Sequence, residues 1–330
     1  MVTMKDLKVR ACIAMTIAVL VVSCKERASD KINAATISKE ITQKPHELLV
    51  AQPDSIKTPE GMVWVSGVEF TQGAGAGDAL ALPREKPAHP VAVDGFFIDQ
   101  TEVTNAQFQK FVDATGYVTL AERPVDWEAM KKTLPPGTPK PADSLLQPGS
   151  LIFDRSVQQV TDLNNYTQWW EWKIGANWKH PQGPDSTIEG KANYPVVHIS
   201  YEDALAYCKW ANRRLPTETE WEAAAHGKLP GGIYTWGDDA TALPEKANTW
   251  QGTFPTKNSD EDGYAYAAPV ASYAPNSLGI YDLSGNVWEL TQDWFSTRYY
   301  QEVAGSKSIN PQGAVESYNL ENPYQPEKVI

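Results

Sequence analysis

Apolar residues recur at helical spacing in three stretches of this 330-residue chain. In the first, TNAQFQKFVDATG, the apolar residues Phe108, Phe111 and Val112 share one face. Thr104 or Asn105 suits the start of a helix, because a side-chain oxygen can accept a free backbone N–H there. The spacing therefore predicts a helix that ends at Gly116, since glycine readily adopts the conformation that follows a helix.

A second helix is predicted over residues 200–214. Ser200 and Asp203 have the spacing of a capping box, in which each side chain bonds the other residue's backbone N–H. The residues at i, i+3, i+4 and i+7 form the inward face: Ala204, Tyr207, Cys208 and Ala211. This spacing points the Cys208 thiol towards the core.

A third helix is predicted over residues 217–226. Thr217 precedes Glu220 by three residues, which is again the spacing of a capping box, and Gly227 stops the helix. The residues expected to face inward are Trp221, Ala224 and Ala225.

Shorter apolar runs predict strands within 62–70, 90–99, 194–200 and 268–275, with long loops between them. These runs do not alternate regularly with the helices, so an α+β fold is expected rather than a doubly wound sheet. Residues 120–180 are expected to form an elaborate insertion within a single domain.

The composition adds many turn-forming and aromatic residues to this pattern. The chain has 12 Trp, 14 Tyr, 24 Pro and 22 Gly, which favours well-packed irregular loops. Its formal charge of -12 argues against a nucleic-acid partner and favours a cationic one.

The N-terminus carries the pattern of an export signal. Lys5, Lys8 and Arg10 precede an apolar run over residues 11–22, which is short for a membrane span. The run ends in VVSC at Cys24, which resembles the lipobox of bacterial lipoproteins. An uncleaved signal anchor is the alternative.

The resemblance to a lipobox implies a division of the chain into three parts. Residues 1–23 would be a signal peptide, Cys24 a lipidated first mature residue, residues 24–60 a polar tether, and residues 61–330 the folded domain. The expected location is a bacterial cell envelope, with membrane contact through the lipid anchor only.

Common catalytic signatures are absent from the sequence. It contains no Gly-rich phosphate loop, no G-x-S-x-G and no H-E-x-x-H, and its five histidines lack metal-ligand spacing. His198 is interpreted as a hydrogen-bonded strand residue. Cys208 is the only cysteine after Cys24, so it is either a buried free thiol or a thiol that needs a partner from elsewhere.

Oxygen-bearing side chains cluster in DLSGNVWELTQDW, residues 282–294. Two tryptophans, Trp288 and Trp294, are interleaved with four such residues: Asp282, Asn286, Glu289 and Asp293. Taken alone, this pattern fits two structures equally well. One is a turn followed by a half-buried strand whose carboxylates face water, and the other is a cation site.

A second oxygen-rich stretch begins at Asn258. Asn258, Asp260, Asp262 and Gly263 fit the first, third, fifth and sixth places of a calcium-binding loop. The twelfth place is Pro269 where such a loop needs glutamate, so an EF-hand is excluded. A cation-binding loop and a plain acidic turn both remain open.

Several blocks together identify a family resemblance. WKHPQGPDSTI, YPVVHISYEDALAYCKWANRRLPTETEWEAAA, ANTWQGTFP and APVASYAPNSLGIYDLSGNVWELTQDW, in this order, are similar to the formylglycine-generating enzymes, or sulfatase-modifying factors. The resemblance extends from about Gly61 to the last residue. It implies a loop-rich α+β fold related to C-type lectins.

The resemblance also implies an activity. Such enzymes use oxygen and a copper(I) ion held by two cysteine thiolates to oxidise the cysteine of a Cys-x-Pro-x-Arg sulfatase motif to formylglycine. Copper(I) is a soft ion, which accounts for its thiolate ligands. The partner implied is an unfolded or extended sulfatase peptide.

Two structural calcium ions are implied as well. The first set, by matching blocks, is the side chains of Asn248 and Asp262 with the carbonyls of Thr249 and Tyr264. The second set is the side chains of Asp282 and Glu289 with the carbonyls of Gly285 and Val287. Asp282 stands where relatives commonly carry asparagine, and the tryptophans are expected to pack the loop.

One departure leaves the activity of this chain open. No cysteine follows Cys208, so no catalytic residue is assigned, and the copper-binding pair is expected beyond Ile330 in a longer chain. Strand edges near Val329 and Ile330 would then lack partners. The alternative is a non-catalytic surface lipoprotein that uses the same scaffold to bind a partner.

Overall fold

The computed structural model describes residues 46–330 except residues 76 and 230, and its compact unit runs from Glu47 to Ile330. The predicted signal peptide and the lipidation at Cys24 lie outside the described residues. Within the part that is described, every helix is too short or too polar to span a bilayer.

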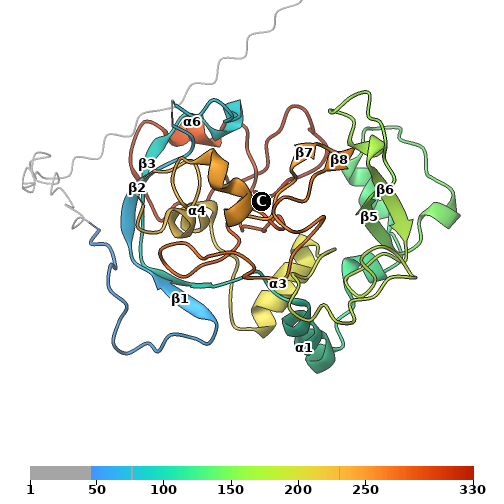
Figure 1. The fold of residues 1–330 in the computed structure, drawn as a ribbon. Coiled ribbons are helices and arrows are strands. Elements are labelled where there is room, and N and C mark those ends of the chain that lie inside the picture. Colours follow the sequence, from blue (N-terminus) through green and yellow to red (C-terminus); the bar gives the residue numbers. More distant parts are fainter. Residues whose placement is uncertain (1–45, 76, 230) are drawn as a thin grey trace, which may run out of the picture. The chain divides into compact units, whose positions relative to one another are not determined.

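The strands form four small sheets that are connected by long loops (Figure 1). β1 (Met62–Val65) pairs with β4 (Phe96–Asp99), β5 (Gly149–Phe153) with β6 (Trp170–Ile174), and β7 (Gly252–Thr253) with β8 (Lys257–Asn258), all antiparallel. β3 (His89–Val93) lies between antiparallel β2 (Val68–Gln72) and parallel β9 (Ser308–Ile309). The predicted α+β class is confirmed.

The three predicted helices are confirmed as α1 (Asn105–Thr115), α3 (Tyr201–Trp210) and α4 (Glu218–His226). Each begins after the capping residue that the sequence indicates, namely Thr104, Ser200 and Thr217, and each forms a capping box. Three shorter α-helices are α2 (Trp127–Met130), α5 (Leu243–Lys246) and α6 (Tyr299–Val303). Six 3-10 turns complete the described elements: Pro83–Glu85, Leu120–Glu122, Lys131–Thr133, Asp143–Leu145, Tyr166–Gln168 and Ala240–Ala242.

Two apolar clusters hold these elements together. Phe108 and Phe111 of α1 pack with Tyr207 of α3 and with the fully buried Trp178, which brings α1 beside α3 (Figure 1). In the other cluster, the helix face predicted for α4 packs on Val65 and on the loop before the candidate site; its buried members are Val65, Ala224, Ile280 and Leu283. Through Leu283, the second cluster therefore anchors the oxygen-rich loop to the core.

Two of the predicted strands are wrong. Residues 194–200 contribute only an isolated bridge from Pro195 to Thr104, and residues 268–275 form no strand. Their backbone groups bond singly to different segments, as Val270 N–H does to the carbonyl of Asn193 at 2.8 Å. Ala271 has a φ of 58°, which is incompatible with a continuous strand.

Both ends of the unit are tied to its interior. The carbonyl of Leu49, in the predicted tether, accepts hydrogen bonds from Gly67 and Gly95 at 3.2 and 2.7 Å, so packing begins before Gly61. At the other end, Val329 N–H donates to the carbonyl of Asp293, and the carbonyl of Val329 accepts from Thr291, both at 3.1 Å. The expectation that Val329 is unpaired is therefore wrong.

Candidate metal centre

The first predicted cation site is assembled around Asp262. This residue is 9% exposed, and its carboxylate accepts the backbone N–H groups of Thr249 at 2.8 Å and Tyr264 at 3.0 Å. Asn248, also 9% exposed, donates its amide to the carbonyl of Tyr266 at 2.9 Å. The four predicted residues lie close together. Thr249 and Tyr264 contact Asp262 through their backbone N–H groups and not through the carbonyl groups predicted as ligands.

The second predicted site is a tight turn around Asp282. Asp282 has a φ of 59°, and its carboxylate accepts the backbone N–H of Ala271 at 2.6 Å. Within the turn, the Gly285 carbonyl accepts the N–H of Val287 at 3.1 Å. Burial raises the pKa of Glu289, the other carboxylate of this site, to about 7, and the negative charge of Asp282 adds to the rise.

A third carboxyl group, Glu102, faces the second site and was missed by the sequence reasoning. It is 8% exposed, and its Oε2 is buried without a hydrogen-bond partner. Burial is the largest cause that raises its pKa to about 8, followed by the charge of Asp282, with Glu289 contributing as well. Buried carboxylates that oppose one another in this way need either protons or a cation.

Asn286 links the two sites through its side-chain amide. Its Nδ2 donates to Glu102 Oε1 at 2.7 Å, while its Oδ1 accepts from Asn248 Nδ2 at 3.0 Å and from the N–H of Ala268 at 2.8 Å. The backbones also touch, because a Cβ on Gly285 would lie 2.3 Å from the carbonyl oxygen of Asn248. The two loops therefore form one connected unit.

The donors available fit calcium better than a transition metal. Among residues 46–330, apart from the two that are not described, no three His, Cys, Asp or Glu side chains are placed together for one ion. The first site offers one carboxylate, Asp262, and the second offers Asp282 and Glu289 with Glu102 facing them. The other predicted ligands are neutral oxygens. Calcium accepts such mixed oxygen ligands, and the buried, unpartnered Oε2 of Glu102 fits a missing positive charge.

The tryptophans of this segment do not pack the loop as expected. Trp288 is 78% exposed. Trp294 stacks under the Lys328 ammonium, which lies 3.6 Å from its ring centre. The Asp293 carboxylate stabilises the start of α4, because its Oδ2 accepts the N–H of Glu218, the first residue of that helix, at 2.9 Å.

The calcium-loop pattern at Asn258 is not reproduced. Asn258 Oδ1 accepts the N–H of Gln251 at 2.9 Å, so this oxygen already holds a turn. Asp262 alone of that pattern reaches the predicted site. The remainder behaves as a plain acidic turn.

The residues that are described do not fit copper(I). Cys208 is their one free cysteine; it is half-buried, and burial raises the pKa of its thiol, with Asp99 adding to the rise. A thiolate ligand needs the opposite shift. His198 is held at both ring nitrogens, by Ser150 Oγ at 2.8 Å and the carbonyl of Pro181 at 2.9 Å, so it is satisfied as expected, although in a loop.

The fold and the two linked loops define the class of protein: an α+β domain with few regular elements and two adjoining loops rich in oxygen donors. The sulfatase-modifying factor enzyme 1-like domain matches residues 48–321. The chain is 41% identical over 256 residues to a formylglycine-generating enzyme of Thermomonospora curvata, which covers 77% of this chain and 78% of that protein. It belongs to the formylglycine-generating enzyme family, which confirms the resemblance found in the sequence.

Two further similarities bear on function and on fold. The chain is 39% identical over 235 residues to a Mus musculus protein named inactive C-alpha-formylglycine-generating enzyme 2, which covers 70% of this chain and 68% of that protein. The structure of PvdO from Pseudomonas aeruginosa matches with a TM-score of 0.50 and 22% identity, covering 79% of this chain and 82% of that chain. At that identity the likeness shows the fold alone.

Proposed function

We propose that this chain acts in sulfatase maturation by binding the Cys-x-Pro-x-Arg segment of a sulfatase as an extended peptide, whose cysteine becomes formylglycine. The observation that carries the proposal is the 41% identity with a formylglycine-generating enzyme over 77% of the chain. The excess of acidic residues suits a peptide that carries arginine.

An apolar row on the β5–β6 hairpin supports a peptide partner. Leu151 and Trp172 are cross-strand neighbours that are 45% and 44% exposed, and Ile174 on the same face is 43% exposed. On the opposite face Ile152 is 6% exposed, and Phe153, at one end of the row, packs against Trp250, so only the rest of the row is exposed. A two-stranded sheet with free edges can also pair with an extended peptide.

The family oxidation needs copper(I) and a thiolate pair, which the described residues do not supply. A second candidate function is therefore a non-catalytic scaffold that binds the same kind of peptide. The inactive relative, 39% identical to this chain, favours this alternative.

The test is peptide binding followed by turnover. A fluorescent Cys-x-Pro-x-Arg peptide should bind, and Leu151→Ser should weaken binding by about tenfold, since buried apolar area on that scale contributes about 1.4 kcal/mol. Leu163→Ser, at a leucine that is 65% exposed elsewhere, should not. Absence of binding, or equal effects of the two variants, would refute the peptide surface.

Mass spectrometry then separates the two functions. With copper, reductant and oxygen, loss of the peptide thiol and gain of an aldehyde identifies an oxidase. Binding without turnover identifies the scaffold.

We further propose that the chain is attached to a bacterial envelope membrane through lipid on Cys24. Each buried methylene of an acyl chain contributes about 0.8 kcal/mol, so several chains give stable attachment. Cys24→Ala should move the protein from the membrane fraction to the soluble fraction. Retention of this variant in the membrane would contradict the proposal.

A further inference from the structure

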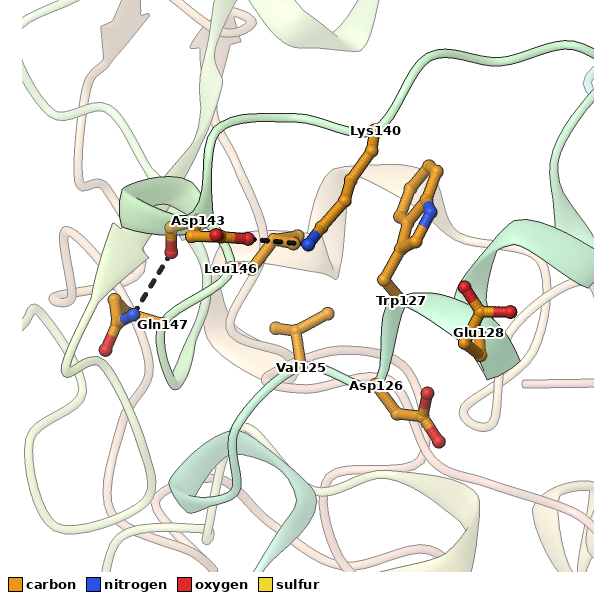
Figure 2. Close-up of a pocket in the computed structure, with 8 residues that line it drawn as sticks. All are labelled: Val125, Asp126, Trp127, Glu128, Lys140, Asp143, Leu146 and Gln147. Atoms are coloured by element: carbon orange, nitrogen blue, oxygen red, sulfur yellow. Dashed lines mark hydrogen bonds and ion pairs between the residues drawn. The ribbon is translucent and has the colours of Figure 1, made fainter.

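A polar hollow of about 490 Å³ lies in the insertion, between α2 and the turn at Asp143–Leu145 (Figure 2). Its lining comes from residues 125–128, Lys140, Asp143, Leu146 and Gln147. None of these residues belongs to the candidate metal centre or to the apolar row of β5–β6. The hollow is therefore a separate surface feature.

The walls of the hollow are fixed by bonds within the insertion. Val125 N–H donates to the carbonyl of Leu146 at 3.3 Å and joins the two segments. Asp126 caps α2 by accepting the N–H of Ala129 at 3.1 Å, and Gln147 Nε2 donates to the carbonyl of Asp143 at 3.1 Å. These bonds hold the lining in place without a ligand.

Charge selects what the hollow can accept. The Lys140 ammonium pairs with Asp143 Oδ1 at 2.7 Å, and both side chains are exposed (Figure 2). Glu128 pairs with Lys131, and the Asp126 carboxylate caps α2. The charged groups of the lining therefore already have partners in the chain, which favours a neutral ligand that both donates and accepts hydrogen bonds.

The indole of Trp127 adds a flat apolar wall. It is half-buried and lies beside Lys140, with Val125 and Leu146 also lining the hollow (Figure 2). The face of an aromatic ring is electronegative and attracts weakly positive C–H groups. A ligand with one flat C–H face and a rim of hydroxyl groups matches both features.

We propose that this hollow binds a neutral saccharide. One face of a sugar ring would stack on Trp127, and its hydroxyls would accept from Lys140 and Gln147 and donate to Asp143. A hydroxyl both donates and accepts, so it can bond to both members of the exposed Lys140–Asp143 pair. Pockets of this volume suit a ligand of one or two sugar rings.

The proposal is tested with cellobiose, maltose and lactose at millimolar concentration, using saturation-transfer difference NMR on the whole folded chain. At least one of them should give a signal at its ring protons, and Trp127→Ala should reduce the affinity at least tenfold. Gln147→Ala should reduce it by a smaller factor. The matched control is Trp288→Ala, which removes a 78% exposed indole elsewhere and should leave binding unchanged.

Three results would overturn the proposal. They are no signal from any of the three sugars, equal effects of Trp127→Ala and Trp288→Ala, and saturation by N-acetyl-arginine amide in place of the sugars. Circular dichroism of each variant shows whether it is folded, and Trp127→Phe, which keeps a flat ring, should restore part of the affinity if Trp127→Ala does not fold.

Discussion

Asn286 is the residue on which the two oxygen-rich loops depend. One amide satisfies Glu102, Asn248 and Ala268 together, with bonds of 2.7–3.0 Å. Its φ of 72° lies in the left-handed region, which asparagine tolerates better than most residues. The same side chain therefore fixes both a turn and the link between the sites.

Asn286→Ala should lower the free energy of unfolding by about 3 kcal/mol, because each buried partner left unsatisfied costs about 1–3 kcal/mol. Urea unfolding measures the change. The matched control is Asn164→Ala, at an exposed asparagine, which should change it by less than about 0.5 kcal/mol. Equal effects of the two substitutions would show that the link carries no stability.

Glu102 should make the cation-free protein sensitive to pH. Its pKa is raised from an ordinary 4.5 to about 8, so the folded state holds a proton that the unfolded state releases. Stability is therefore highest near pH 5 and falls as the pH rises towards 8. Glu289, with a pKa of about 7, acts in the same direction.

Glu102→Gln should remove much of this loss, which is on the order of a few kcal/mol. Thermal unfolding in chelator between pH 5 and 8 measures it. A wild-type melting temperature that stays level across this range would contradict the burial of uncompensated carboxyls.

Among the elements, α4 connects the core to the candidate site. Thr217 caps it and is 2% exposed, with its Oγ1 accepting the N–H of Glu220 at 3.0 Å. Thr217→Ala should cost about 1–2 kcal/mol in the free energy of unfolding, whereas Thr217→Ser keeps the acceptor and should cost less. Equal losses for the two would assign the effect to packing instead of capping.

The same elements show which features can be predicted from sequence. The helices α1, α3 and α4 were predicted because capping and helical spacing are local signals. The strands at 194–200 and 268–275 were wrong because a strand depends on a partner, and these segments bond singly to scattered groups. Glu102 could not be found by pattern, since it meets Asn286 across 184 positions of the chain.

For the whole molecule, the family resemblance implies the two ligand sets, and the loops that carry them touch at Gly285 and Asn248. No local sequence pattern predicts the connection between the two sets through Asn286. Since regular sheets are small, the long loops depend on such connections for their order. A bound divalent cation at each set would neutralise carboxylates and fasten loops that are far apart in sequence.

The most direct test of this account is to count calcium ions by native mass spectrometry and to follow unfolding in parallel. Wild type should hold two calcium ions, and Glu289→Ala and Asp262→Ala one each. At a hundredfold excess over Kd, each ion that binds only the folded state adds about 2.7 kcal/mol, so chelation should lower the wild-type Tm by several degrees. No bound calcium at millimolar concentration, together with an unchanged Tm in chelator, would contradict the account.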